Sequence, residues 1–223
     1  MTHAPTSLTE ENYLKAIFAL SEKETGAKVS TNAIAARVNT AAASVTDMLK
    51  RLADKGLVQY EKYHGVQLTP RGESIAKDLV RKHRLWEVFL MQKLGFAWDE
   101  VHAMAEDLEH VDHPELIQRL AEFLGNPRFD PHGDPIPDQH GNIAYHEELY
   151  LSQLQAGDRG LIVAVEQDDA EFLRYLVKVG LVLNAEIEIL ETEEYDGSRF
   201  VRVGKHKRTI TEKVGQKLLV RKV

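Results

Sequence analysis

The first third of the chain carries apolar residues at helical spacing in three separate stretches. Residues 7–10 (Ser-Leu-Thr-Glu) have the spacing of a capping box, and the apolar positions after them predict a helix to about residue 21. Ser30 or Thr31 caps a short second helix, and Gly56 follows the end of a third. The inner face of the third helix is formed by Val45, Leu49 and Leu52.

Two short extended segments follow these helices, at 57–61 and 66–68. The residues between them are few enough for a hairpin connection. Three helices and a hairpin within roughly 70 residues are the pattern of a winged helix-turn-helix.

The outer face of the third predicted helix favours contact with DNA. Small residues at its leading end allow close approach to the major groove, and alanine or threonine methyls can touch thymine methyls. The candidate DNA-contacting residues are Ala42, Ala43, Ser44, Thr46, Asp47, Lys50 and Arg51 of the helix, with Lys62 and His64 of the hairpin. Alanines that are simply good helix formers and lysines that are merely solvated would explain the same residues. Helix-turn-helix folds also occur as protein-interaction modules.

The middle of the chain predicts three more helices. Thr69-Pro70 begins the first, which runs to about residue 93, and Asp99 caps the second, through residue 110. The third starts at His113-Pro114. These helices carry more apolar residues than one buried face of each helix needs, and Trp86 and Trp98 are among them. We therefore expect a buried helix–helix surface that is used in a homodimer.

The last third predicts about five strands and one helix, preceded by a loop or linker at 126–142 that is rich in proline and glycine. The helix covers 170–179, and Asp196-Gly197 is a hairpin turn signal. The extended segments are 161–166, 185–190, 199–203, 209–211 and 218–220. Their number and length predict a small SH3-like β-barrel.

Charge is distributed unevenly along the chain. Of the net charge of −7, residues 1–72 carry +2, residues 73–147 carry −8 and residues 148–223 carry −1. We therefore expect an α+β multidomain protein: an N-terminal winged helix-turn-helix domain (1–72), a helical dimerisation domain with a linker (73–147) and a C-terminal SH3-like β-barrel (148–223). A local positive face on the first domain suffices to engage phosphates despite the overall acidity.

Composition also bears on the compartment. The chain has no cysteine, which excludes disulfides and thiolate metal sites. No apolar run approaches the roughly 18 residues of a membrane helix. The N-terminus lacks the basic region and apolar core of a secretory signal. We expect a cytoplasmic protein with no membrane partner.

Histidine and glutamate recur together between residues 83 and 113. His83 with Glu87, and His102 with Glu106, are four apart, so each pair shares one helix face. The second face continues with Glu109 and His110. Imidazoles and carboxylates presented by neighbouring helices form a site for a divalent metal. An acidic, solvated face would explain the glutamates but not the recurring histidines.

The order of these units resembles the diphtheria-toxin-repressor family of metal-dependent transcriptional regulators. The residues that carry the resemblance are RKHRLWE (81–87), VHAMAEDLEHV (101–111) and DPHGDPIP (130–137). The N-terminal ENYLKAIF and the tail GLVLNAEIEIL, which is similar to a FeoA domain, agree with it.

The resemblance implies a homodimer with two metal sites per subunit. One site would use His83, Glu87 and His102 with Asp168 and Glu171 of the C-terminal domain. The other would use Glu106, Glu109 and His110 with Asn12 of the first helix. Asp168 and Glu171 also suit the start of a helix, where carboxylates stabilise the dipole.

Two positions depart from the branches of the family. Iron-responsive members often carry Cys where this chain has Glu106, and the manganese-responsive branch has Glu there. That branch usually offers Asp at the position of Asn12 and a second acid where Lys15 stands, and it commonly lacks the third domain. The chain therefore combines features of both branches.

The resemblance implies a repressor, and not an enzyme, that senses Mn²⁺ or Fe²⁺ and binds operator DNA of metal-homeostasis genes as a dimer. Zn²⁺, Co²⁺ and Ni²⁺ also bind oxygen and imidazole donors and would substitute in vitro. We expect no small organic substrate. The rival hypotheses are a metal-independent winged-helix regulator and a metal-dependent hydrolase; the second is disfavoured because no His-Glu-x-x-His motif or nucleophile is evident.

A metal shared between Asn12 and the dimer domain would restrict how the winged helices are held. Two recognition helices could then lie one helical turn apart, about 34 Å. Without the metal several orientations compete, and DNA binding must select one of them.

Overall fold

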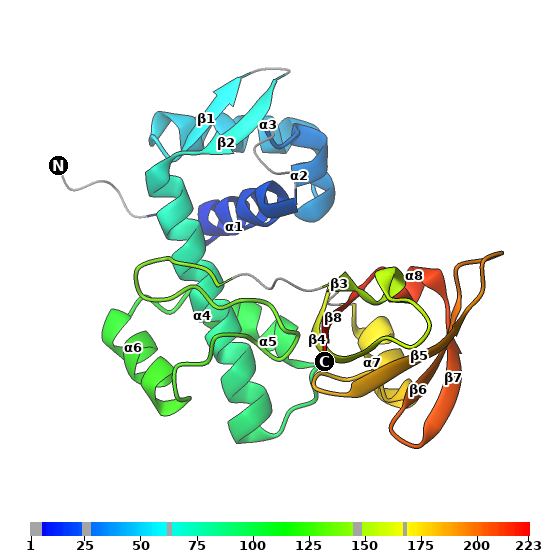
Figure 1. Ribbon diagram of the computed structural model, residues 1–223. Helices are drawn as coiled ribbons and strands as arrows, with labels where there is room; N and C mark the ends of the chain where they lie inside the picture. The colour runs from blue at the N-terminus through cyan, green and yellow to red at the C-terminus, as the bar shows by residue number, and fades with distance from the viewer. Residues whose placement is uncertain (1–5, 24–27, 62–63, 145–148, 167–168) are drawn as a thin grey trace. The chain divides into compact units, whose positions relative to one another are not determined.

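The computed structural model describes residues 6–23, 28–61, 64–144, 149–166 and 169–223 (Figure 1). Its contacts divide the chain into two compact units. The first comprises Met1–Lys82, Glu109–Asp112 and Pro137–Asn142, and the second comprises His83–Leu108, His113–Ile136 and Ile143–Val223.

The first unit contains the winged helix-turn-helix, as predicted. Its elements are α1 (Leu8–Lys23), α2 (Thr31–Arg37), α3 (Ala42–Asp54), β1 (Val58–Glu61) and β2 (Gly65–Leu68). The two strands pair antiparallel, and Val29 forms an isolated bridge with Val66 beside them. Its largest fully buried side chains include Leu14, Ile17, Ile34, Leu49 and Leu52.

Local capping explains where two of these helices begin. The backbone N–H of Ser7 donates to Glu10 Oε2 at 2.8 Å, and that of Glu10 donates to Ser7 Oγ at 3.3 Å, which is the predicted capping box. At α2 the cap is Ser30, whose hydroxyl accepts from the N–H of Ala33, so Thr31 is the first helical residue.

Helix α4 (Pro70–Leu94) begins after Thr69, as predicted, and contributes residues to both units. In the second unit it is followed by α5 (Val101–Leu108) and α6 (Pro114–Phe123). His113 caps α6 by accepting from the N–H of Leu116 at 3.3 Å. Leu85, Val88, Ile117, Leu120, Ala121 and Ile136 form the buried cluster around these helices.

The boundaries predicted for α5 are wrong at both ends. Asp99 does not cap the helix; it accepts a hydrogen bond at 3.0 Å from Arg174, and a turn precedes Val101. The helix ends at Leu108, so Glu109 and His110 lie in the turn that follows it. The helical spacing of Glu109 and His110 therefore continues past the last hydrogen-bonded residue of the helix.

The C-terminal region forms the β domain expected from the strand pattern. Its elements are β3 (Leu149–Tyr150), η1 (Leu151–Gln153), β4 (Arg159–Val165), α7 (Ala170–Val179), β5 (Glu186–Thr192), β6 (Arg199–Val203), β7 (His206–Ile210), α8 (Glu212–Gly215) and β8 (Leu218–Lys222). The strands form one antiparallel sheet in the order β3-β8-β4-β5-β6-β7. The pattern missed β3 and α8, which span only two and four residues.

Of the two tryptophans, Trp86 packs against the helical cluster of α4 and α6, whereas Trp98 does not. Trp98 belongs to the core cluster of the β domain, with Leu151, Leu154 and Leu173 among its members. Trp86 is only partly buried and meets Phe89 edge-to-face, with ring centroids 5.8 Å apart.

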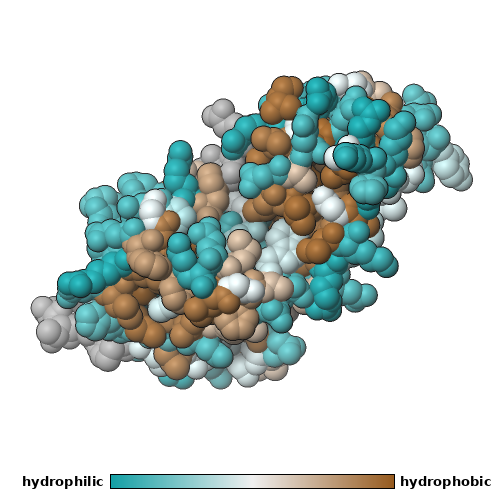
Figure 2. Space-filling model, turned by 90° about the horizontal axis from the view of Figure 1, so that it is seen from below, coloured by the Kyte–Doolittle hydropathy of each residue, from teal (hydrophilic) through white to brown (hydrophobic). Residues whose placement is uncertain are grey.

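Exposed apolar residues gather instead on the outer parts of the helical region. Figure 2 shows a hydrophobic area over α4 and α6. The large exposed hydrophobic residues of this region are Leu94, Phe96, Leu116 and Phe123, of which Phe123 is 64% exposed. No helix among the described residues is long and apolar enough to cross a membrane.

Candidate metal centre

Two helices bring the predicted histidines and glutamate together. The four-residue spacing places His83 Nε2 3.0 Å from Glu87 Oε1 on α4. His102 of α5 completes the group, with its Nδ1 3.1 Å from His83 Nε2 and 3.2 Å from Glu87 Oε1. His83 and Glu87 are buried, and His102 is half-buried. One carboxylate and two imidazoles therefore converge on a single point.

A second group shares Glu87 and was not predicted. His132 Nδ1 lies 3.7 Å from Glu87 Oε2 and 4.0 Å from Asp130 Oδ1. All three residues are buried, and their candidate ligand atoms lie within 4.8 Å of one another. Among the described residues, these are the two groups of three or more metal-ligating side chains that come together, and Glu87 belongs to both.

The loop that carries Asp130 and His132 is fixed by its own hydrogen bonds. Asp130 Oδ1 accepts from the backbone N–H of His132 at 2.7 Å and from that of Asp134 at 2.9 Å. The carbonyl of His132 accepts from the N–H of Val165 on β4 at 2.8 Å. These bonds attach the loop to the β domain and present its imidazole to α4.

The hydrogen bonding of His132 defines which ring nitrogen faces the carboxylates. Its Nε2 lies 3.0 Å from the carbonyl oxygen of Trp98, which can only accept, so Nε2 carries the proton. In the neutral ring Nδ1 then offers its lone pair toward Glu87. Metal-bound histidines typically donate their second ring N–H to a carbonyl or carboxylate in this way.

Burial and charge shift the acidities of this group in opposite directions. Burial raises the pKa of Glu87, but hydrogen bonds from His102, His132 and His83 outweigh it, and the pKa lies well below the usual value. Burial, Asp134 and Glu87 raise the pKa of Asp130 well above its usual range. Burial lowers the pKa of His132, but Glu87 and Asp130 raise it to about 9. The metal-free group thus holds protons that a metal would have to replace.

Comparison with known proteins gives the same assignment along the whole chain. The family model of the iron-dependent repressor N-terminal DNA-binding domain matches residues 6–66. That of the iron-dependent repressor metal-binding and dimerisation domain matches residues 69–138. A FeoA domain matches residues 149–222.

Individual relatives agree with these matches. The diphtheria toxin repressor of Corynebacterium efficiens is 31% identical, over 88% of this chain and 80% of the relative. The chain belongs to the diphtheria-toxin-repressor family of metal-dependent transcriptional repressors. The iron-dependent repressor IdeR of Mycobacterium leprae is 29% identical, over 96% of this chain and 97% of its own length. A solved structure of a manganese-dependent transcriptional repressor in complex with manganese is 33% identical, with a TM-score of 0.85, and covers 96% of this chain and 100% of its own.

The predicted family and fold of this repressor are thereby confirmed. The matched relatives are named as repressors rather than enzymes, as expected.

Helix α3 exposes most of the outer face predicted for it. Ala42, Ala43, Ser44, Asp47, Lys50 and Arg51 are exposed on or near α3, and Thr46 is half-buried. Lys50 Nζ lies 3.2 Å from Asp47, and both side chains are exposed. His64 is exposed at the start of β2, whereas Lys62 lies outside the described residues.

Part of the second predicted metal site is also brought together. Glu109 is 1% exposed, and its Oε1 lies 3.8 Å from His110 Nε2. His110 Nδ1 lies 2.8 Å from Glu11 of α1, and Lys15 of the same helix lies 2.6 Å from Glu109 Oε2. Glu11 was not predicted, although it stands beside Asn12 and four residues before Lys15.

The remaining predicted ligands are Asn12, Glu106, Asp168 and Glu171. Asn12 is exposed on α1. Glu106 Oε1 lies 3.6 Å from His102 Nε2, at the edge of the first group. Glu171 is exposed in the first turn of α7 and belongs to neither group, and Asp168 lies outside the described residues.

Asp130 and His132 could have been found from sequence. They stand in the motif DPHGDPIP, which also supports the family resemblance. An imidazole and a carboxylate two residues apart in a proline-rich loop carry no periodic signal, so spacing alone did not mark them.

Proposed function

We propose that this chain is a homodimeric repressor that binds Mn²⁺ or Fe²⁺ and, with metal bound, occupies double-stranded operators of metal-homeostasis genes in the cytoplasm. The observation that carries the proposal is Glu87. It is a buried carboxylate with imidazoles at both oxygens, His83 and His102 at Oε1 and His132 at Oε2. Such a convergence of donors is costly without a cation or protons to balance it.

The donor chemistry fits these ions. Every candidate ligand offers an imidazole nitrogen or a carboxylate or amide oxygen, because the chain has no cysteine. Mn²⁺ and Fe²⁺ accept such mixtures, and Zn²⁺, Co²⁺ and Ni²⁺ often bind them more tightly. The iron-dependent relatives and the manganese-bound structure support keeping both ions in the proposal.

We assign two metal sites to each subunit. The first consists of His83, Glu87 and His102 with Asp130 and His132, and retains Asp168 and Glu171 as predicted donors. The second consists of Glu106, Glu109 and His110 with Asn12, and Glu11 positions His110. A bound cation supplies the positive charge that neutralises these carboxylates and orders their side chains.

The DNA-binding part of the proposal rests on α3 and the hairpin. We divide the chain into a DNA-binding domain (1–72), a dimerisation and metal-binding domain (73–147) and a FeoA-like domain (148–223). Small residues at the start of α3 allow close approach to base edges, and Lys50 and Arg51 contact phosphates. Metal bound at the second site favours the arrangement of the recognition helices that fits the operator.

The experiment that tests the proposal is operator binding as a function of metal. Duplexes selected from genomic fragments are titrated with protein by fluorescence anisotropy, anaerobically, with Mn²⁺, Fe²⁺, Zn²⁺ or a chelator. We expect Mn²⁺ or Fe²⁺ to raise affinity at least tenfold, about 1.4 kcal/mol, and His110→Ala to abolish the increase. Glu115→Gln is the control, because Glu115 pairs with Arg119 at the exposed surface of α6.

Two outcomes would contradict it. Equal DNA affinity with metal and with chelator would favour a metal-independent winged-helix regulator. Turnover of phosphatase or peptidase substrates that depends on metal would favour a hydrolase.

A further inference from the structure

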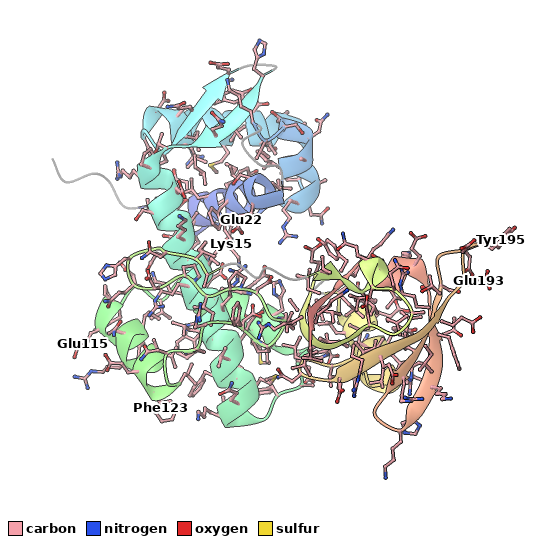
Figure 3. All side chains as sticks on the ribbon, viewed as in Figure 1. Lys15, Glu22, Glu115, Phe123, Glu193 and Tyr195 are labelled. Atoms are coloured by element: carbon pink, nitrogen blue, oxygen red, sulfur yellow. The ribbon has the colours of Figure 1, made fainter. Side chains whose placement is uncertain are left out.

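The helix α1 places a lysine on a carboxylate that belongs to the proposed second metal site. Figure 3 labels Lys15 on α1. Its Nζ lies 2.6 Å from Glu109 Oε2, and the Glu109 side chain is 1% exposed. The other oxygen of Glu109 lies 3.8 Å from His110 Nε2. The ammonium therefore contacts the same buried carboxylate that would serve as a ligand.

This ion pair stabilises the metal-free protein. A carboxylate that is removed from water must be paired or protonated, and Lys15 supplies the pairing charge from within the chain. Glu11 accepts a hydrogen bond from His110 Nδ1, at 2.8 Å. Both residues lie on one face of α1, four positions apart.

The same ion pair opposes a metal. A divalent cation that takes Glu109 must displace the ammonium or accept its repulsion at short range. Lys15 also weakens the attraction for the cation. Glu11 and Glu109 together carry two negative charges, and the ammonium of Lys15 cancels one of them.

We propose that Lys15 is a tethered competitor for Glu109 that sets the metal concentration at which the second site fills. Its effect is to raise the metal threshold of the repressor without contributing a ligand. The inference rests on the proposed function, because it requires that Glu109 and His110 bind metal.

The test is calorimetric titration with Mn²⁺ alone, without DNA, in a Glu87→Gln background that removes the shared ligand of the other site. Lys15→Met keeps the aliphatic stem and removes the ammonium. We expect it to raise Mn²⁺ affinity by roughly tenfold or more and to lower the melting temperature of the metal-free protein. Lys15→Gln, which can still donate to Glu109, should show the same gain in affinity with a smaller loss of stability.

The matched control is Lys55→Met. Lys55 Nζ pairs with Glu10 at 2.8 Å, and the Glu10 side chain is also 1% exposed and lies on α1. Its loss should lower the melting temperature in the same way but leave Mn²⁺ affinity unchanged. Unchanged or weaker Mn²⁺ affinity in both Lys15 variants would overturn the inference, and so would an equal gain in Lys55→Met.

Failure of the proposed function gives a different result. Adding His110→Ala to the Glu87→Gln background should then leave Mn²⁺ binding unaltered, because no metal would occupy Glu109 and His110. If His110→Ala removes the binding but the Lys15 variants do not strengthen it, the site stands and only the role of Lys15 is wrong.

Discussion

A single carboxylate, Glu87, connects the two groups of candidate ligands. His83 and His102 lie at its Oε1, and His132 lies at its Oε2. The helix repeat positions His83 one turn away on α4, but His132 comes from a distant loop. Glu87 is thus the residue whose loss would affect the largest number of donors.

We predict that Glu87→Gln lowers metal binding at the first site, because the amide is neutral and offers one oxygen where the carboxylate offers two. Equilibrium dialysis with Mn²⁺ should show the loss of about one ion per subunit, or a weakening of at least tenfold, about 1.4 kcal/mol. The control is Glu73→Gln, which alters an exposed carboxylate on the same helix that pairs with Lys77. Full stoichiometry and affinity in Glu87→Gln would remove this residue from the site.

Among the structural elements, the loop that carries Asp130 and His132 depends on a glycine for its position. Gly133 has a φ of +89°, and a Cβ built on it would lie 2.1 Å from the carbonyl oxygen of Val163. No side chain fits between this loop and β4 without moving one of them. The close approach allows the carbonyl of His132 to accept from the N–H of Val165.

Gly133→Ala should therefore displace the loop and weaken metal binding through Asp130 and His132. We expect a loss of roughly 3 kcal/mol or more in stability, since backbone strain of about 1–3 kcal/mol is joined by a steric clash. Gly125→Ala is matched in backbone conformation, with a φ of +77°, but a Cβ there has no neighbour within 4 Å. Gly125→Ala should lower the free energy of unfolding by the backbone strain alone. Urea unfolding and Mn²⁺ titration of both variants measure the difference, and equal effects would contradict it.

The start of α1 gives a prediction about pH. Burial raises the pKa of Glu10, but the hydrogen bonds from Lys55 and the N–H of Ser7, with the charges of Lys55 and Arg51, lower it below its usual value. The folded protein therefore binds this proton more weakly than the unfolded chain. Glu10 then stabilises the fold above the unfolded pKa, and that stability is lost as the pH falls through the folded value.

Comparison of wild type with Glu10→Gln tests this linkage. We expect the variant to be less stable by about 1.5–3 kcal/mol near pH 7, the range for a hydrogen bond to a charged group. The difference should be smaller at about pH 3, because the unfolded chain is then protonated and the pH is falling toward the lowered pKa of the folded protein. Urea unfolding at the two pH values measures it, with Glu115→Gln as the exposed control. A difference independent of pH would show that the charge of Glu10 does not matter.

At the scale of the whole molecule, an acidic chain must bind a polyanion through a local surface. The net charge of −7 is carried mainly by residues 73–147. The exposed cations Lys50 and Arg51 lie on α3, where they are available for phosphates. We therefore expect long-range attraction to DNA to be weak and affinity to depend on a few contacts.

Lys50→Ala should weaken binding to all DNA sequences and lower the slope of log affinity against log salt by about 1. Anisotropy titrations of the metal-bound protein at several salt concentrations provide the slope. Lys178→Ala is the control, because Lys178 is exposed on α7 of the FeoA-like domain. A slope unchanged by Lys50→Ala would remove this residue from the DNA contacts.

Features that depend on short spacing follow directly from the amino-acid sequence. Capping residues and apolar periodicity defined most helices and strands, and the four-residue repeat paired His83 with Glu87 and His102 with Glu106. The order of the domains and their motifs indicated the family. These signals are readable because a helix places residues four apart on one face whatever surrounds it.

Which distant residues meet depends on tertiary packing. Packing of a loop against β4 brought Asp130 and His132 to Glu87, and the docking of α1 placed Glu11, rather than the expected Asn12, on His110. It also placed Lys15, a residue that departs from the family pattern, in contact with Glu109. No local period records such pairs, because they depend on how buried surfaces and charges fit together across the fold.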